Sequence, residues 1–147
     1  MPFKQTFGRC LLVSICVLSG LGKLADPGPN EKLLLEGYSK LFAKAKEIGF
    51  ELPLKPQVLS IYTNQLIILT AVLLLLGSGL VIFNQKLGVV ILAGLFISFN
   101  VVIHNPWIYT KDQEFLFHFY QALQNFGVLC GFLLVCKTNS EEKEKKD

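Results

Sequence analysis

Apolar runs separated by short polar segments dominate the chain, and this pattern predicts helices that cross a membrane. A helix needs about 20 mostly apolar residues to cross the hydrocarbon core of a bilayer. Residues 59–83, 87–104 and 115–136 meet or approach this length without any Lys, Arg, Asp or Glu. Residues 7–24 approach it as well, because Arg9 and Lys23 can extend toward opposite interfaces. We therefore expect an all-α protein with four transmembrane helices at these positions.

The segment between the first two spans, residues 31–50, has a different pattern. Leu34, Leu41 and Ile48 recur on one helical face, whereas Lys40 and Lys44 lie elsewhere. The segment is too charged to cross a membrane. It is typical of an amphipathic helix that lies in the membrane interface or covers the end of a bundle.

Polar side chains interrupt the apolar pattern of the last span. Glu114, His118, Gln121 and Asn125 are spaced so that they share one helical face. In lipid these side chains would lack hydrogen-bond partners, so we expect this face to turn toward protein. Glycines in three spans indicate close contacts between helices. The expected packing glycines are Gly77, Gly79, Gly94, Gly127 and Gly131.

Four spans would bring the polar ends of all the helices to the same side of the membrane. We predict a polar cavity that opens on this side and binds a protein segment, a lipid headgroup or a quinone. The alternative is that these groups only form hydrogen bonds between helices, each contributing about 1 kcal/mol or less. The predicted cavity residues are Lys23, Asn64, Gln65, Asn100, His104, Glu114, His118, Gln121 and Asn125.

The composition narrows the functional classes. Apolar residues make up 52% of the 147 residues and the mean hydropathy is +0.49, which argues against a soluble fold. The net charge of +3 comes from loops and a tail, so nucleic-acid binding is not expected. The cysteines and histidines match no metal-ligand spacing, and no nucleophile or phosphate-loop motif is present. We therefore expect no enzymatic activity, no metal and no cofactor.

Basic residues alone do not orient the chain, because seven of the 14 Lys and Arg residues fall on each side of the predicted membrane. Charges in the long first loop count less, which favours cytosolic termini. Residues 1–136 form the predicted transmembrane domain, and residues 137–147 form a charged tail that we expect to be disordered. Within this tail, Lys143 and Lys145 have the spacing of a retrieval signal to the endoplasmic reticulum.

Two different motifs stand near the two ends of the chain. FGR opens the first span at residues 7–9, and FHFYQALQNFGVLCGFLLV occupies residues 117–135. These motifs resemble the HR-like lesion-inducing family, within the wider DoxX and surfeit-locus-four group of small membrane proteins. The resemblance implies a four-helix bundle in the endoplasmic reticulum or related membranes, without an established enzymatic activity. It includes residues 7–24 as a retained helix. The alternative from the residues is a cleavable signal peptide, since a basic start precedes a short apolar core.

We therefore expect a non-enzymatic integral membrane protein of the endoplasmic reticulum. It would bind a protein client or lipid through its cavity, in trafficking, quality control or a cell-death-related role. The alternative is a DoxX-like, quinone-binding subunit of a membrane oxidoreductase, with His104 or His118 donating to a quinone oxygen. A structural subunit of a larger membrane complex is a third option.

Overall fold

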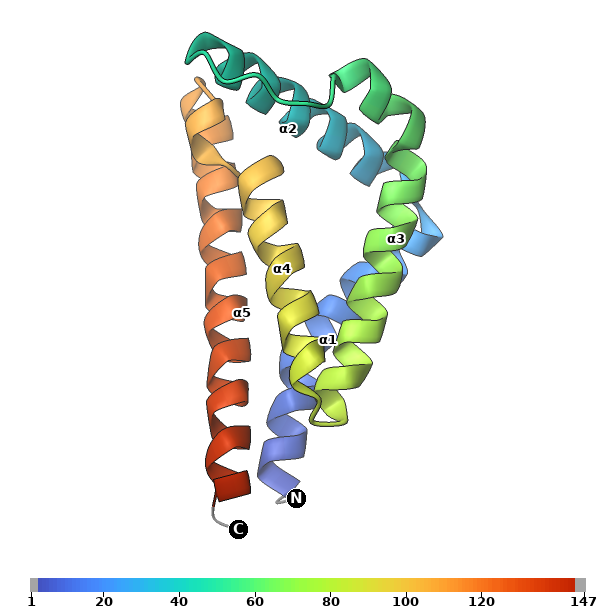
Figure 1. Cartoon of the computed structure of the whole chain (residues 1–147), viewed down its shortest axis with the longest axis vertical. Coiled ribbons are helices and arrows are strands. Elements are labelled where there is room, and N and C mark those ends of the chain that lie inside the picture. The colour runs from blue at the N-terminus through green and yellow to red at the C-terminus, as the bar shows by residue number, and fades with distance from the viewer. Residues whose placement is uncertain (1–2, 145–147) are drawn as a thin grey trace.

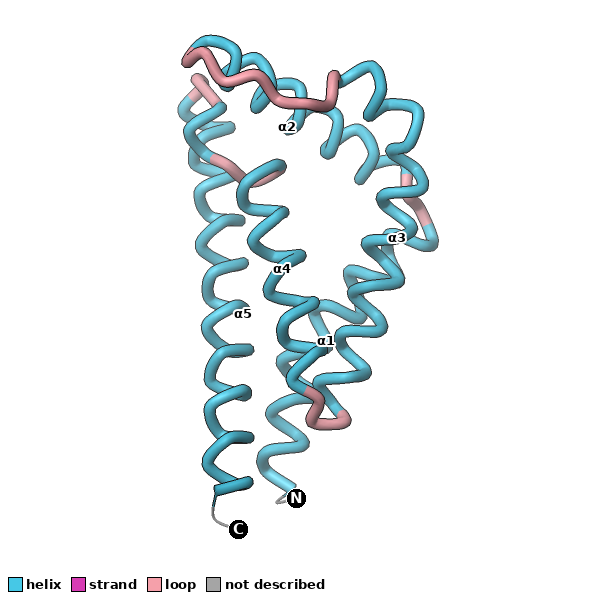
Figure 2. The backbone as a smooth tube through the Cα atoms, in the orientation of Figure 1, coloured by secondary structure: helices cyan, strands magenta, loops and turns pink. Residues whose placement is uncertain are grey.

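The structure, a computed structural model, describes residues 3–144, and over this range every regular element is a helix (Figure 1). Four long helices run alternately up and down, and a fifth crosses one of their ends (Figures 1 and 2). Both termini and the turn between the third and fourth helices lie at the opposite end. The elements are α1 (Phe3–Ala25), α2 (Gly28–Glu47), α3 (Pro56–Ile82), α4 (Lys86–Val102), the 3-10 turn η1 (Pro106–Ile108) and α5 (Asp112–Glu144).

Three stretches are long and apolar enough to cross a membrane: Thr6–Ala25, Pro56–Ile82 and Lys86–Ile108. The expected all-helical, multi-pass architecture is confirmed to this extent. The described part of α5 is less apolar, because His118, Gln121, Gln124 and Asn125 lie within it.

The helix ends differ from the predicted ones where the local chemistry decides them. α2 stops at Glu47 because Gly49 adopts a φ of 79°, a left-handed conformation typical of helix ends. α3 starts at Pro56. Proline suits this position because the backbone N–H groups of a first helical turn have no partner within the helix, so the N–H that proline lacks is not missed. α5 continues past Cys136 to Glu144, so the tail predicted from residue 137 is helical as far as that residue. Lys145 lies outside the described residues.

α3 and α4 approach each other most closely near the turn that joins them. A methyl group at Gly88 would lie 2.6 Å from the Gly77 carbonyl oxygen and 2.7 Å from the Val81 nitrogen, so only glycine permits this contact. From here the two helices diverge toward α2 (Figure 1). The core fills the narrow end of the fold with Val13, Cys16, Leu74, Val81, Val89, Leu92, Phe96 and Phe132.

α2 spans the wide end, where α3 and α4 have separated (Figure 2). It contacts α3, α4 and η1. Gly37 permits the contact with α4, because a methyl group there would lie 2.6 Å from the Val102 carbonyl oxygen. The Tyr38 hydroxyl also donates to the Leu54 carbonyl at 2.7 Å, which ties α2 to the segment leading into α3. The predicted amphipathic helix therefore covers the open end of the fold.

Candidate functional site

A cavity of about 340 Å³ lies beneath α2, where α3 and α4 diverge. We call it the α3–α4 cavity. Leucine, isoleucine, valine and phenylalanine side chains form most of its lining. The polar lining residues come from α1, α2, α3 and α4 and from the segment that follows α4: Lys23, Asn30, Thr70, Ser98 and His104.

A second cavity of about 610 Å³ lies among α1, α4 and α5, and we call it the α1–α5 cavity. Ser19 and Lys23 of α1 and Gln121, Gln124 and Asn125 of α5 line it. Three residues line both cavities and therefore mark the place where they adjoin: Lys23, Phe99 and His104.

Among the described residues, Lys23 is the only Lys or Arg that lines either cavity. It lies in the last turn of α1 and is half-buried. Its Nζ donates to Ser19 Oγ at 2.8 Å and lies 5.6 Å from the centre of the Phe99 ring. Within residues 6–134, no carboxylate forms an ion pair with it. The positive charge next to both cavities is therefore not neutralised by this part of the chain.

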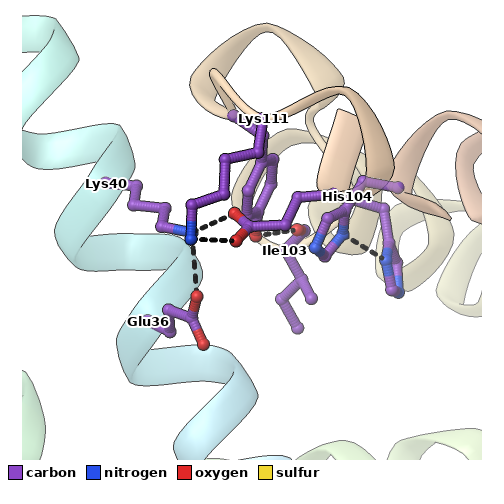
Figure 3. Close-up of polar contacts among 8 residues, drawn as sticks. Glu36, Lys40, Ile103, His104 and Lys111 are labelled. Carbon is purple, nitrogen blue, oxygen red and sulfur yellow. Dashed lines mark hydrogen bonds and ion pairs between the residues drawn. The ribbon is translucent and has the colours of Figure 1, made fainter. Parts of the chain in front are cut away.

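The two histidines meet at the junction of α4, η1 and α5. His104 Nδ1 and His118 Nδ1 are 3.4 Å apart, which permits a hydrogen bond when one nitrogen carries a proton and the other does not (Figure 3). The Tyr109 ring stacks on His118 with 3.8 Å between ring centres and 10° between planes. The Tyr109 hydroxyl donates to the Ile103 carbonyl at 3.2 Å. His118 is buried by these contacts and does not line either cavity.

An ion-pair cluster joins α2 to the start of α5 beside the histidines (Figure 3). Lys40 Nζ lies 2.8 Å from Glu36 and 3.1 Å from Glu114, and 4.1 Å from the centre of the Tyr109 ring. Lys111 approaches the second oxygen of Glu114 at 3.3 Å. This cluster fixes α2 across the open end.

The charges within this cluster shift each other's pKa values. Hydrogen bonds from Lys40 and Lys111 hold the pKa of Glu114 below its ordinary value. Burial works to lower the pKa of Lys40, but hydrogen bonds to Glu36 and Glu114 outweigh it and raise that pKa. Burial also raises the pKa of the Tyr109 phenol. Lys40 and Glu114 therefore stay charged near neutral pH.

Asn100 and Asn125 join α4 to α5 deeper in the fold, with Asn125 Nδ2 donating to Asn100 Oδ1 at 2.8 Å. Asn125 also borders the α1–α5 cavity, whereas Asn100 faces a shallower groove beside Trp107 on the outer side of α4 and α5. Gln121 borders the α1–α5 cavity and forms no hydrogen bond with another described residue.

The predicted cavity residues thus fall into three groups. Lys23, His104, Gln121 and Asn125 line the cavities. Asn100, Glu114 and His118 form hydrogen bonds or ion pairs between helices. Asn64 and Gln65 line neither cavity and are exposed, because the buried face of α3 carries Thr63 and Ile67 instead.

Several residues at this site lacked a clear signal in the sequence. Lys40 and Tyr109 are central to the cluster, yet the contacts of Lys40 with Glu114 and with the Tyr109 ring join residues that are far apart in the chain. Phe99, which lines both cavities, looks in the sequence like any apolar residue of a span. Of the expected packing glycines, Gly77 and Gly131 make close contacts, whereas a methyl group at Gly79, Gly94 or Gly127 would meet nothing within 4 Å.

The chemistry that this arrangement supports is binding. An apolar cavity with a charged amine at one side suits a ligand that has both an apolar and a polar part. In the part of the chain that the structure describes, no three His, Cys, Asp or Glu side chains gather as a metal-ligand set. No protein-family model, no curated protein and no solved structure matches the chain.

Proposed function

We propose that the chain is a non-enzymatic integral membrane protein that binds a lipid or an apolar segment of a protein client in the α3–α4 and α1–α5 cavities. One observation carries this proposal. The α3–α4 and α1–α5 cavities adjoin at Lys23, Phe99 and His104, so apolar space and polar groups meet inside the fold. A bundle whose polar groups served only as contacts between helices would not need to leave this space.

In this proposal α5 is a fourth span, and α1, α3, α4 and α5 form a four-helix transmembrane bundle. α5 runs beside α4 over the length of α4 (Figure 1). Its polar residues His118 and Asn125 bond to α4, which removes them from lipid. Large apolar side chains occupy its exposed surface, as expected where a helix faces lipid: Leu116, Phe119, Leu123, Phe126 and Leu133.

The proposed compartment is the endoplasmic reticulum or a related membrane, with both termini in the cytosol. The two termini lie at the same end of the fold, which supports their placement on the same side of the membrane (Figure 1). The lysine pattern at Lys143 and Lys145, together with the resemblance to the HR-like lesion-inducing and DoxX group, supports the compartment. Trafficking, quality control or a cell-death-related process would be the setting.

A quinone is the second candidate ligand, because His104 borders both cavities and carries a ring nitrogen that can donate to a carbonyl oxygen. In that case the chain would act as a quinone-binding subunit of a larger membrane oxidoreductase. His104→Ala would then abolish reduction of an added quinone analogue by the native complex.

A cavity-filling variant tests the proposed function. Gly127 borders the α1–α5 cavity, and a Cβ atom there would meet nothing within 4 Å, so we expect Gly127→Phe to place its ring in the cavity. Gly94→Phe is the matched control, since Gly94 is equally open but lines neither cavity. The full-length chain, purified in mild detergent, should retain lipid or a client protein in native mass spectrometry. Gly127→Phe should lose that ligand and Gly94→Phe should keep it. Equal retention by these two variants and by Ser98→Phe, which fills the α3–α4 cavity, would contradict the proposal.

A further inference from the structure

We propose that the α3–α4 cavity binds a single-chain anionic amphiphile, with Lys23 as the counter-ion of its carboxylate or phosphate head. This inference rests on the proposed function, because it assigns a ligand class to one of the two cavities. The supporting observations are the charge at the cavity, the composition of its lining, its size and the position of its rim.

The charge at this cavity lacks a compensating group. Ionisable side chains at membrane depth are normally paired, because an isolated charge is costly to remove from water. Lys23 has a neutral hydroxyl and an aromatic ring as neighbours, and no carboxylate of residues 6–134 forms an ion pair with it. The other partly buried lysine, Lys40, has two carboxylates within 3.1 Å. An anionic head beside Lys23 would supply the missing partner.

The lining matches an amphiphile and not a small polar anion. Polar lining groups near Lys23 include Asn30, which follows it after one short turn, and His104. An anionic head can accept hydrogen bonds from the Asn30 amide and from a protonated nitrogen of His104. The remaining wall is mostly hydrocarbon from α3 and α4, including Leu66, Leu73 and Leu95. A free phosphate ion would leave this apolar space unfilled.

Size and access favour a single chain that enters from the bilayer. At about 340 Å³, the cavity lies at the small end of the range of about 300–1,000 Å³ for ligand pockets. Leu69 on α3 is 53% exposed and Ser98 on α4 is also exposed, and both line the cavity. The rim therefore reaches the surfaces of two helices that are apolar enough to face lipid. We therefore expect an acyl chain to enter the cavity between α3 and α4.

Photolabelling of the full-length protein in neutral phosphatidylcholine nanodiscs tests this inference. Three probes with the same diazirine-bearing chain are compared: a fatty acid, a lysophosphatidic acid and an uncharged monoacylglycerol. One or both anionic probes should label α3 or α4 at the cavity at least about tenfold more than the monoacylglycerol, as expected for one charge-assisted hydrogen bond. The anionic probe that labels more strongly identifies a carboxylate or a phosphate as the preferred head.

Variants of the protein test whether the stronger labelling by anionic probes depends on the positive charge of Lys23. Lys23→Met should lower anionic labelling by about tenfold or more, whereas Lys23→Arg and the exposed control Lys32→Met should keep it. Ser98→Phe should block the cavity, and Ile97→Phe, an exposed neighbour that does not line it, should not. The probe comparison on the unaltered protein stands even if Lys23→Met fails to fold.

Equal labelling by charged and uncharged probes, lost in Ser98→Phe, would overturn the charge inference and leave the proposed binding function intact. Unchanged labelling of a folded Lys23→Met variant would also overturn the charge inference and leave the proposed binding function intact. The Lys23 side chain would then only extend toward the membrane interface. Absence of labelling by all three probes would also overturn the inference. Native mass spectrometry of Gly127→Phe, Ser98→Phe and Gly94→Phe would still decide the proposed function separately.

Discussion

Single glycines determine how closely the helices of this protein approach. Gly88 fits against the Gly77 carbonyl, and a methyl group there would lie within 2.7 Å of three backbone or side-chain atoms. We expect Gly88→Ala to lower the free energy of unfolding by about 1–3 kcal/mol, the usual effect of overpacking. Gly94→Ala on the same helix should be neutral or slightly stabilising, because alanine favours helix and the site is open. Thermal unfolding in detergent measures both. Equal effects of the two variants would show that α3 and α4 do not pack here.

The turn between α3 and α4 depends on another single residue. Asn84 adopts a φ of 62°, and asparagine and glycine tolerate this left-handed conformation better than other residues. Asn84→Gly should leave the thermal unfolding temperature unchanged or raise it slightly. Asn84→Val should lower it, because a β-branched side chain in this conformation costs roughly 1–2 kcal/mol. Similar temperatures for the two variants would mean that the turn readily adopts another conformation.

Acid should weaken the attachment of α2 to α5 through Glu114. Because the folded pKa of Glu114 lies below its ordinary value of 4.5, the carboxylate stabilises the fold above that value. Its contribution is lost as the pH falls through the lower, folded pKa. Hydrogen exchange of α2 should therefore rise as the pH falls below 4.5 and through the folded pKa. Glu114→Gln should show raised exchange already at neutral pH, with a smaller acid effect. The control Glu47→Gln, which breaks an ion pair within α2, should keep the normal acid response.

For single residues, helical spacing within α5 predicted correctly which side chains face protein, whereas position along α3 did not. The spacing of His118, Gln121 and Asn125 placed them on one face of α5, and that face does turn toward protein. Asn64 and Gln65 were assigned to the cavity only from their position along the span. α3 is apolar nearly all round, so its pattern does not indicate which face is buried, and these two side chains are exposed.

At the scale of whole elements, α5 is attached mainly to α4. The contacts are Asn100 with Asn125, Phe96 with Phe132 and the histidine pair, whereas its contact with α1 is small. A double-mutant cycle of Asn100→Ala and Asn125→Ala should give a coupling energy of about 0.6–1.7 kcal/mol, the range for hydrogen bonds between membrane helices. Unfolding in detergent measures it. A coupling near zero would mean that each amide has another partner in the membrane.

The positions of the helices along the chain were predictable from the sequence, whereas the contacts between the helices were not. Uncharged runs and prolines located all five α-helices to within a few residues, except at the end of α5, because length and charge depend only on local sequence. The divergence of α3 from α4 and the closure of the gap by α2 depend on contacts between distant residues. Gly37 against Val102 and Lys40 against Glu114 are the contacts that place α2, and neither has a local pattern.

At the scale of the whole molecule, the narrow end and the wide end have different roles. The glycine contact at the α3–α4 turn and the adjoining apolar core hold the helices together at one end. At the other end α2 holds them apart, and both cavities lie between these two constraints. The α1–α5 cavity shares Leu74 and Phe96 with the core, whereas no buried member of the core lines the α3–α4 cavity. We therefore expect variants of the α3–α4 cavity to disturb the core less than variants of the α1–α5 cavity.

The proposed topology leads to a prediction about sidedness. If α5 crosses the membrane, the C-terminus and the α3–α4 turn lie on one side, and the loop after α2 lies on the other. Single cysteines at Gln85→Cys, Glu51→Cys and an added C-terminal position report this, in a chain whose four native cysteines are replaced. In intact microsomes, a membrane-impermeant maleimide should label Gln85→Cys and the C-terminal cysteine, and should label Glu51→Cys only after permeabilisation. Protection of the C-terminal cysteine together with Glu51→Cys would show that α5 does not cross, because an odd number of spans separates the N-terminus from the C-terminus. Only three spans would then remain.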